Sequence, residues 1–292
     1  MKLMPSLIRL QLAAAMLCLA GAAFANEYPA KSIRLIVPAA PGGGADFLAR
    51  IVGVKLGELV GQSTSIVIAP QLYPKLPYDT LKDLKAVTLV AEVPNVMVVH
   101  PSVPASTVKE LIALAKAKPD MLNFGSSGNG APSHLAGEMF KSATGTRLVH
   151  VPYKGAGPAV NALLAGEIQV MFAPIVAVLP QVKAGRLRAL GVTSAKRSAA
   201  APDLPTLAEA GLTGYEISSW FGLFVPASTP NAVVDKLYKD TLRVLKSPDV
   251  LERFAKEGAE SVGNSPADFN NYVRAEFVKY NKVIKDNGIK AD

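Results

Sequence analysis

The chain has 292 residues, of which 50% are hydrophobic, and a formal net charge of +8. A chain of this length can bury enough surface to fold on its core alone, and its composition is that of an α/β protein of one or two domains. Its lysines and arginines are scattered, without a dense basic run or an aromatic–basic motif, which argues against nucleic-acid binding.

The first 25 residues predict a cleaved secretion signal. Lys2 and Arg9 give a positive start, residues 12–22 are apolar, and Ala23-Phe24-Ala25 is a cleavage site of the small-x-small type. The apolar stretch is too short to span a bilayer comfortably. Cleavage would also remove Cys18, the only cysteine, so the mature protein would contain no disulfide, thiolate nucleophile or cysteine metal site. We therefore expect an exported protein.

A glycine turn follows the first predicted strand, residues 33–37, and a helical pattern begins directly after it. Gly42, Gly43, Gly44 and Ala45 would present bare backbone N–H groups at the N-terminus of that helix, where the macrodipole favours an anion. A tight connection without a ligand is the alternative, and both interpretations stay open at this point. The turn is not a P-loop, because no Gly-Lys-Ser/Thr closes it, and its glycines are not spaced as in a dinucleotide fingerprint.

Strand-like runs and helical patterns alternate along the rest of the chain, which favours a largely parallel sheet. Strands are predicted at residues 96–99, 122–124, 148–151, 168–172, 187–193 and 215–225. Helices are predicted at residues 108–116, 132–140, 158–165 and 179–184, and two more begin at Thr229-Pro230 and Ser265-Pro266. Thr107 and Glu110 form a capping box, and Gly166 and Gly185 are placed to end two helices. A second glycine turn, residues 125–130, separates a strand from a helix.

These residues resemble the periplasmic solute receptors of the tripartite tricarboxylate transporters, the Bug or TctC-like family. The matching motifs are Tyr28-Pro-x-Lys31, Pro-Gly-Gly-Gly-x-Asp46, Leu76-Pro-Tyr-Asp79, Pro94-Asn-Val96, Asn123-Phe-Gly-Ser-Ser-Gly-Asn-Gly130, Ser133-His-Leu-Ala-Gly-Glu138, His150-Val-Pro-Tyr-Lys-Gly155, Gly185-x-Leu-Arg-Ala-Leu190 and Leu204-Pro-Thr206. Each motif is weak alone, but together they cover essentially the whole chain after the signal.

The resemblance implies an α/β, two-lobed type II periplasmic-binding-protein fold with a ligand cleft between the lobes. Lobe 1 would comprise residues 26–103 and 222–292, and lobe 2 residues 104–221. The implied ligand is a small carboxylate, such as a di- or tricarboxylate, delivered in the periplasm to the membrane subunits of a tripartite tricarboxylate transporter. We expect a monomer without enzymatic activity, cofactor, metal or nucleic-acid partner.

The resemblance also indicates which residues face the ligand. Lobe 1 would contribute the N–H groups of Gly42, Gly43, Gly44 and Ala45. Lobe 2 would contribute Ser126, Ser127, Gly128, Asn129, Gly130, Ser133, His134, Tyr153, Lys154, Gly155, Phe172 and Ala173. His134 either contacts the ligand or is hydrogen-bonded within its helix start, and Lys154 either pairs with a distal carboxylate or is a solvated surface lysine. Ala173 replaces an aspartate that many relatives carry, which argues against an amino-acid ligand.

One departure from the family pattern follows Gln62. A strand–helix–strand crossover of roughly 30 residues is absent, and the chain passes directly to residues 63–70. Residues 65–69 could fill one vacant sheet position but not two, and unpaired strand edges are costly. This predicts a remodelled lobe 1 with weakened or abolished ligand affinity.

Two other function classes are alternatives to a transport receptor. An exported hydrolase is disfavoured because no Gly-x-Ser-x-Gly elbow raises a serine, and no histidine cluster indicates a metal. A ligand-sensing partner of a signalling receptor is compatible with the implied fold.

Overall fold

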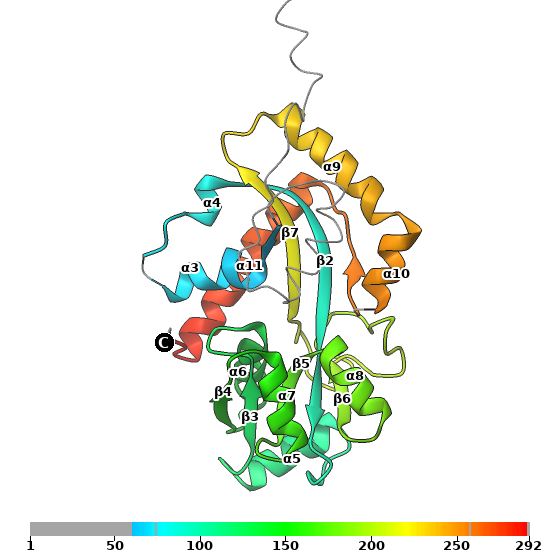
Figure 1. Ribbon diagram of the computed structural model, residues 1–292. Helices are drawn as coiled ribbons and strands as arrows, with labels where there is room; N and C mark the ends of the chain where they lie inside the picture. The colour runs from blue at the N-terminus through cyan, green and yellow to red at the C-terminus, as the bar shows by residue number, and fades with distance from the viewer. Residues whose placement is uncertain (1–59, 74, 257, 291–292) are drawn as a thin grey trace, which may run out of the picture.

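The computed structural model describes residues 60–73, 75–256 and 258–290 (Figure 1). The predicted secretion signal, the first strand and the first glycine turn, with Gly42 to Ala45, lie outside the described residues.

The described chain alternates strands and helices. The strands are β1 (Val60–Gln62), β2 (Leu84–Val99), β3 (Asn123–Ser126), β4 (Val149–Pro152), β5 (Val170–Pro174), β6 (Arg188–Val192), β7 (Ser218–Pro226) and β8 (Glu260–Ser261). The helices are η2 (Thr64–Ile68, a π-helical turn), α3 (Ala69–Leu72), α4 (Thr80–Asp83), α5 (Val108–Ala117), α6 (Pro132–Thr144), α7 (Ala156–Leu164), α8 (Ile175–Lys183), α9 (Asn231–Leu245), α10 (Pro248–Lys256) and α11 (Pro266–Asp286). Among them, none combines the length and the apolar character needed to cross a bilayer.

Strand β2 runs through the whole molecule (Figure 1). Its first part, residues 84–94, pairs with β7, which in turn pairs with β1. Its last part, residues 95–99, lies between β5 and β6, and β5 continues the sheet through β3 to β4. We call residues 60–94 and 218–290 the β7 half, and residues 95–217 the β3 half. The predicted lobe boundaries at 103/104 and 221/222 stay a prediction, whereas the sheet changes partners at 94/95 and 217/218.

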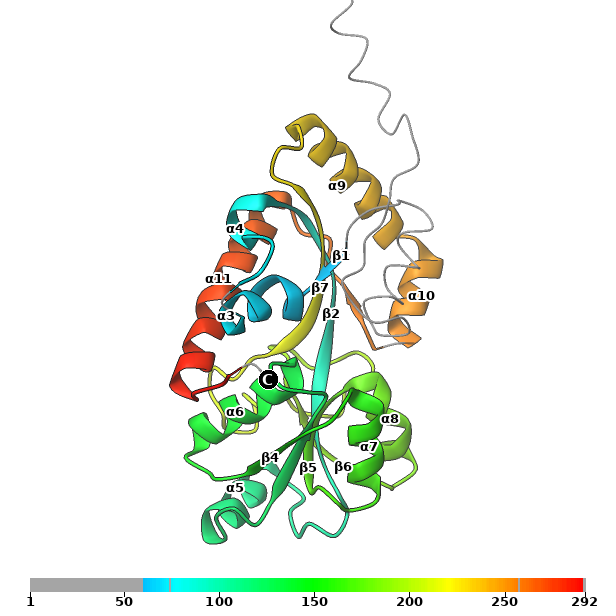
Figure 2. The ribbon, with the colours of Figure 1, turned by 60° about the vertical axis from the view of Figure 1, so that its left-hand side comes forward.

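Helices cover both faces of the sheet in each half (Figures 1 and 2). In the β7 half, α11 covers one face and α9 with α10 the other. In the β3 half, α5 and α6 cover one face and α7 and α8 the other. The apolar side chains under α11 and α6 form one continuous cluster, which includes Trp220, Phe269, Phe124 and Phe140. The opposite face carries two separate clusters, one in each half. The molecule therefore has a shared core on one side only.

Local sequence signals set several helix ends as predicted. Thr107 Oγ1 accepts from the Glu110 N–H group at 3.2 Å, although the Glu110 carboxylate reaches back to Ser106 N–H rather than to Thr107. Ser265 Oγ accepts from Asp268 N–H at 3.2 Å at the start of α11. Gly166, directly after α7, has a φ of 77°, a left-handed conformation that glycine adopts without strain.

Two predictions about the sheet were wrong for the described residues. Only the β3–β4 and β3–β5 pairings are parallel, and the five pairings that involve β2 or β7 are antiparallel. The reason is that β2 and β7 run in opposite directions between the two halves. Residues 65–69 do not form a strand, because residues 64–72 are helical and bury Ile66, Val67 and Ile68 in the shared cluster.

Candidate functional site

The second glycine turn, residues 126–130, joins β3 to α6 and is held by side chains that follow it. Ser133 Oγ accepts from the Ser127 N–H group at 3.0 Å and lies 2.9 Å from Ser127 Oγ. His134 Nδ1 accepts from the Gly130 N–H group at 3.1 Å. Because Nδ1 is an acceptor here, the ring of His134 carries its hydrogen on Nε2, which lies 3.8 Å from the Glu138 carboxylate. The first turn of α6 therefore fixes the shape of the glycine turn.

Ser126 holds the same turn from the strand side. Its side chain is fully buried, and Oγ accepts from the Gly128 N–H group at 3.2 Å. Oγ also lies 3.1 Å from the Gly128 carbonyl oxygen and 2.7 Å from Nε2 of His150, a residue of β4. All three contacts are satisfied if His150 donates to Ser126 Oγ and Ser126 donates to the Gly128 carbonyl. His150 thus completes the network that shapes residues 126–130.

The two histidine rings are stacked. The ring centroids of His134 and His150 are 3.8 Å apart with an interplanar angle of 5°, and the Phe124 ring lies 4.8 Å from that of His150. Lys141 pairs with Glu138 at 2.8 Å and lies 5.7 Å from the centre of the Phe124 ring. The stack packs aromatic surface directly behind the glycine turn.

Another turn, residues 153–155, lies beside the glycine turn at residues 126–130. Tyr153 N–H donates to the Ser126 carbonyl at 3.0 Å, and Gly155 N–H donates to the Ser127 carbonyl at 3.1 Å. Gly155, with a φ of 110°, leads directly into α7. The N-termini of α6 and α7 therefore meet at one place, and both present the positive ends of their dipoles there. Burial, with a smaller contribution from the charge of Glu167, raises the pKa of Tyr153.

The predicted site residues are not all brought to this place. Ser126 to Gly130, Ser133, His134, Tyr153, Lys154 and Gly155 lie in or beside the two turns. Lys154 is exposed and forms no ion pair or hydrogen bond with other described residues. Phe172 and Ala173 are fully buried on opposite faces of β5, and Phe172 packs against Phe140 with ring centroids 5.8 Å apart. These two side chains contribute to the core.

Sequence reasoning missed two features of the site. His150 was noted only as part of a motif; the parallel pairing of β3 with β4 places it opposite Phe124, and its ring reaches the Ser126 hydroxyl two residues further along β3. The other feature is the contact with the β7 half: a Cβ on Gly130 would collide with Leu72, and Ile68 lies next to it. The sequence did contain a signal for His150. The residue lies at the end of a predicted strand, and the ends of neighbouring parallel strands lie at the same edge of a sheet.

The Ser126–His150 pair does not form a nucleophile. Ser126 is 0% exposed, and its hydroxyl is used within the turn, so an ester or amide carbonyl has no access to it. Among the described residues, no group of three or more His, Cys, Asp or Glu side chains is placed to hold a metal ion.

Comparison with known proteins agrees with this arrangement. The chain is 32% identical over 300 residues to a UPF0065 protein from the tcbD–tcbE intergenic region of Pseudomonas sp., which covers 91% of this chain and 89% of the relative. It matches the structure of R. palustris Rpa4515 with adipate at a TM-score of 0.78 and 31% identity, covering 90% of this chain and 99% of that one. It matches MatC from Rhodopseudomonas palustris with bound malate at a TM-score of 0.74 and 27% identity, covering 88% and 99%.

The fold is therefore the α/β fold of periplasmic solute-binding proteins, which are transport receptors and not enzymes. Residues 57–289 match the family described as tripartite tricarboxylate transporter family receptor, and the chain belongs to that family.

Proposed function

We propose that this receptor captures a small dicarboxylate at the paired turns, residues 126–130 and 153–155, and delivers it to the membrane subunits of a tripartite tricarboxylate transporter. The observation that carries the proposal is the meeting of the α6 and α7 N-termini, tied by the hydrogen bond from Gly155 N–H to the Ser127 carbonyl. The positive ends of two helix dipoles beside linked turns favour an anion there. Two relatives were solved with dicarboxylates, adipate and malate, which supports the same ligand class.

The donors for the ligand follow from which ones the turn already uses. The N–H groups of Ser127, Gly128 and Gly130 donate to Ser133, Ser126 and His134, so they shape the turn. If Ser133 donates to Ser127 Oγ, the Ser127 hydroxyl hydrogen is left for a ligand oxygen. The first amides of α7, at Ala156 and Gly157, point along the helix axis toward the same place. We assign the first ligand carboxylate to these donors and the second to the exposed Lys154.

The remaining donors would come from the first glycine turn. Gly42, Gly43, Gly44 and Ala45 are proposed to face the ligand from lobe 1, with residues 26–103 and 222–292 as that lobe and residues 104–221 as lobe 2. Contacts to both lobes would favour a closed state, in which the N–H···carboxylate bonds are shielded from water. The receptor would act as a monomer in the periplasm after cleavage of residues 1–25.

A remodelled lobe 1 is the second candidate, and one observation favours it. The alignment to the Pseudomonas relative runs over 300 residues, more than the 292 residues of this chain, although it uses only 91% of them. Part of the relative therefore has no counterpart here, as expected if a strand–helix–strand unit is missing after Gln62. A receptor with such a lobe would bind its ligand weakly or not at all.

Titration calorimetry separates the two candidates. Purified protein is titrated with adipate and with malate, and dimethyl adipate serves as a neutral ligand of similar shape. We expect heat from at least one dicarboxylate and none from the diester. Lys154→Ala should weaken binding of the dicarboxylate about tenfold through loss of one charge-assisted hydrogen bond. Lys183→Ala, at an exposed lysine outside the two turns, is the matched control and should bind as the unaltered protein does.

The outcomes are distinct. A thermal scan accompanies the titration. Cooperative melting with binding at micromolar affinity would rule out a remodelled lobe 1 that binds weakly or not at all. Cooperative melting without heat from any carboxylate would favour the remodelled lobe and contradict capture of an organic acid. Equal effects of Lys154→Ala and Lys183→Ala would contradict the assignment of Lys154.

A further inference from the structure

Within the described residues, the chain passes between the two halves twice. The first passage is inside β2, where Pro94 pairs with β7 and Asn95 pairs with β5. The second is at residues 217–218, where the chain enters β7. Both passages touch Thr193, the residue directly after β6.

The Thr193 hydroxyl connects the two passages in series. Asn95 N–H donates to Thr193 Oγ1 at 3.1 Å, and Oγ1 lies 2.6 Å from the Ile217 carbonyl oxygen. Oγ1 also lies 3.1 Å from the Asn95 carbonyl, but a hydroxyl has one hydrogen, and the shorter contact with Ile217 is the better acceptor. The order is therefore Asn95 N–H to Thr193 O–H to Ile217 C=O.

The backbone of Thr193 also forms hydrogen bonds with the same two segments. Thr193 N–H donates to the Asn95 carbonyl at 2.9 Å, and Ile217 N–H donates to the Thr193 carbonyl at 2.9 Å. Thr193 and Ile217 are fully buried, and Asn95 is 1% exposed. Water cannot replace these bonds, so losing one leaves a buried polar group without a partner.

Thr193 itself is anchored in the β3 half. The preceding residue, Val192, pairs with Val96 of β2 on one side. On the other side it bridges to residues 205–207: its N–H donates to the Pro205 carbonyl at 2.9 Å, and its carbonyl accepts from Leu207 N–H at 2.9 Å. The end of β6 is thus fixed from both sides. Thr193, which follows it, bonds to each crossing segment where that segment leaves the β3 half.

The junction also contains a buried donor for which the described residues provide no acceptor. Nδ2 of Asn95 is buried and has no hydrogen-bond partner among residues 60–73, 75–256 and 258–290. A buried donor gains free energy when it finds an acceptor. A rotation of the crossing segments about Thr193 would change what Nδ2 faces.

We propose that Thr193 is the positioning residue of the interlobe hinge, whose hydroxyl couples the two crossing segments so that they rotate together. Its consequence for ligand capture rests on the proposed function, but the coupling itself is a property of the ligand-free protein. The test is therefore done without ligand, and its failure is distinguishable from a failure to bind a dicarboxylate.

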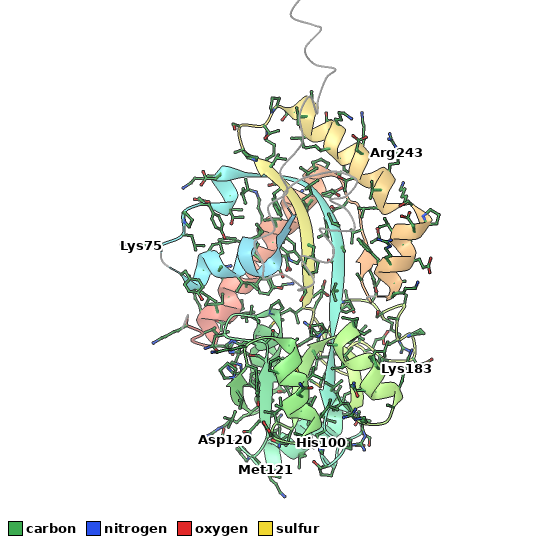
Figure 3. All side chains as sticks on the ribbon, in the orientation of Figure 1. Lys75, His100, Asp120, Met121, Lys183 and Arg243 are labelled. Carbon is green, nitrogen blue, oxygen red and sulfur yellow. The ribbon has the colours of Figure 1, made fainter. Side chains whose placement is uncertain are left out.

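Electron paramagnetic resonance measures the distance between two spin labels across the hinge. Cys18, the only cysteine, is replaced by serine, and labels are attached at Lys183→Cys and Arg243→Cys, which lie on α8 and α9 in different halves (Figure 3). We expect Thr193→Val to broaden the distance distribution and to speed hydrogen exchange of the Asn95 amide about tenfold. Thr193→Ser keeps the hydroxyl and should behave as the unaltered protein.

A matched control separates coupling from stability. Thr206 is also buried, with its Oγ1 accepting from Glu209 N–H at 3.0 Å, and its hydroxyl forms no hydrogen bond with either crossing segment among the described residues. Thr206→Val should lower the melting temperature without changing the distance distribution. If Thr193→Val lowers the melting temperature and leaves the distribution unchanged, the proposal is overturned. If Thr193→Val does not fold, Thr193→Ala is judged by the same two outcomes.

Discussion

Two buried polar networks, one in each half, are built on opposite principles. In the β3 half, Ser126 and His134 accept hydrogen bonds from amides of the turn, and His150 bonds to the Ser126 hydroxyl. The carboxylate next to His134, that of Glu138, pairs with Lys141. In the β7 half, one buried and one half-buried carboxylate, those of Glu276 and Glu92, lie between β2, β7 and α11. Neutral groups give a turn its shape, whereas buried charges make stability depend on which partner or proton they hold.

The network of the β7 half centres on two glutamates. Glu276, 5% exposed, accepts from Trp220 Nε1 at 3.0 Å and pairs with Lys279. Glu92 accepts from the Tyr272 hydroxyl at 2.8 Å. Burial, and then the nearby charges of Glu216, Glu276 and Glu260, raise the pKa of Glu92, although the bond from Tyr272 acts in the other direction. Removing a partner here should therefore cost more than removing one in the β3 half.

The largest effect is expected at Glu276. Glu276→Ala leaves the Trp220 N–H group buried without an acceptor and Lys279 without its partner, so we expect a loss of about 3 kcal/mol in the free energy of unfolding. Glu276→Gln keeps an acceptor and should lose about 1 kcal/mol. Urea denaturation measures both. Equal stabilities of the two variants would show that the Trp220 bond contributes nothing.

The next effect is expected at Ser126. Ser126→Ala removes the acceptor of Gly128 N–H and the partner of His150, at a cost of about 2 kcal/mol. Ser102→Ala is a matched control, because Ser102 Oγ also lies 2.7 Å from a histidine nitrogen, that of His100, but in an exposed position. Its cost should stay within about 0.5 kcal/mol. If the two alanine variants melt at the same temperature, the buried network has no special role.

Glu92 should make stability depend on pH. Its folded pKa lies above 4.5, its usual value, so its stabilising contribution is complete below that pH and is lost as pH rises through the folded pKa. Glu92→Gln retains an acceptor for Tyr272 and should be more stable than the unaltered protein at pH 8, by about 1 kcal/mol, with no gain at pH 4. Denaturation at the two pH values measures the difference. A gain of the same size at both would contradict the pKa assignment.

The smallest effect is expected outside both networks. Glu252 and Lys256 form an exposed pair at 2.7 Å on α10, which lowers the pKa of Glu252. Glu252→Gln should leave the melting temperature within experimental error, because water screens such pairs. A clear drop in melting temperature would contradict the expectation that exposed carboxylates contribute less to stability than buried ones.

Sequence reasoning worked where the relevant contact lies within one turn of the chain. The cap of α5 by Thr107, the start of α11 at Ser265 and the end of α7 at Gly166 depend on residues three or four positions apart. The turn at residues 126–130 was predicted for the same reason, since glycines between a strand and a helix carry a local signal. Of the candidate site, that turn was therefore predicted as a structural feature, whereas Tyr153, Lys154 and Gly155 were indicated only by the family resemblance.

Reasoning from sequence was less successful where contacts with distant segments decide whether a stretch forms a strand or a helix. Residues 84–95 of β2 were not predicted as a strand, because Pro94 interrupts the pattern and only pairing with β7 extends it. The helical form of residues 64–72 depends on packing against α11, where Gln71 Nε2 donates to the Phe277 carbonyl at 3.1 Å. A short apolar run has no periodicity of its own that separates strand from helix.

The sequence alone determined the family, the order of most elements and the place of the turn that we assign to the ligand. Only the tertiary structure decided how that turn's amides are used, that His150 reaches Ser126 across 24 residues, and that Thr193 joins Asn95 to Ile217 across 98 and 24 residues. The physical reason is that hydrogen bonds between distant segments form only after the sheet has set their register. Local sequence signals set the turns, whereas strand pairing in the sheet decides which distant residues contact them.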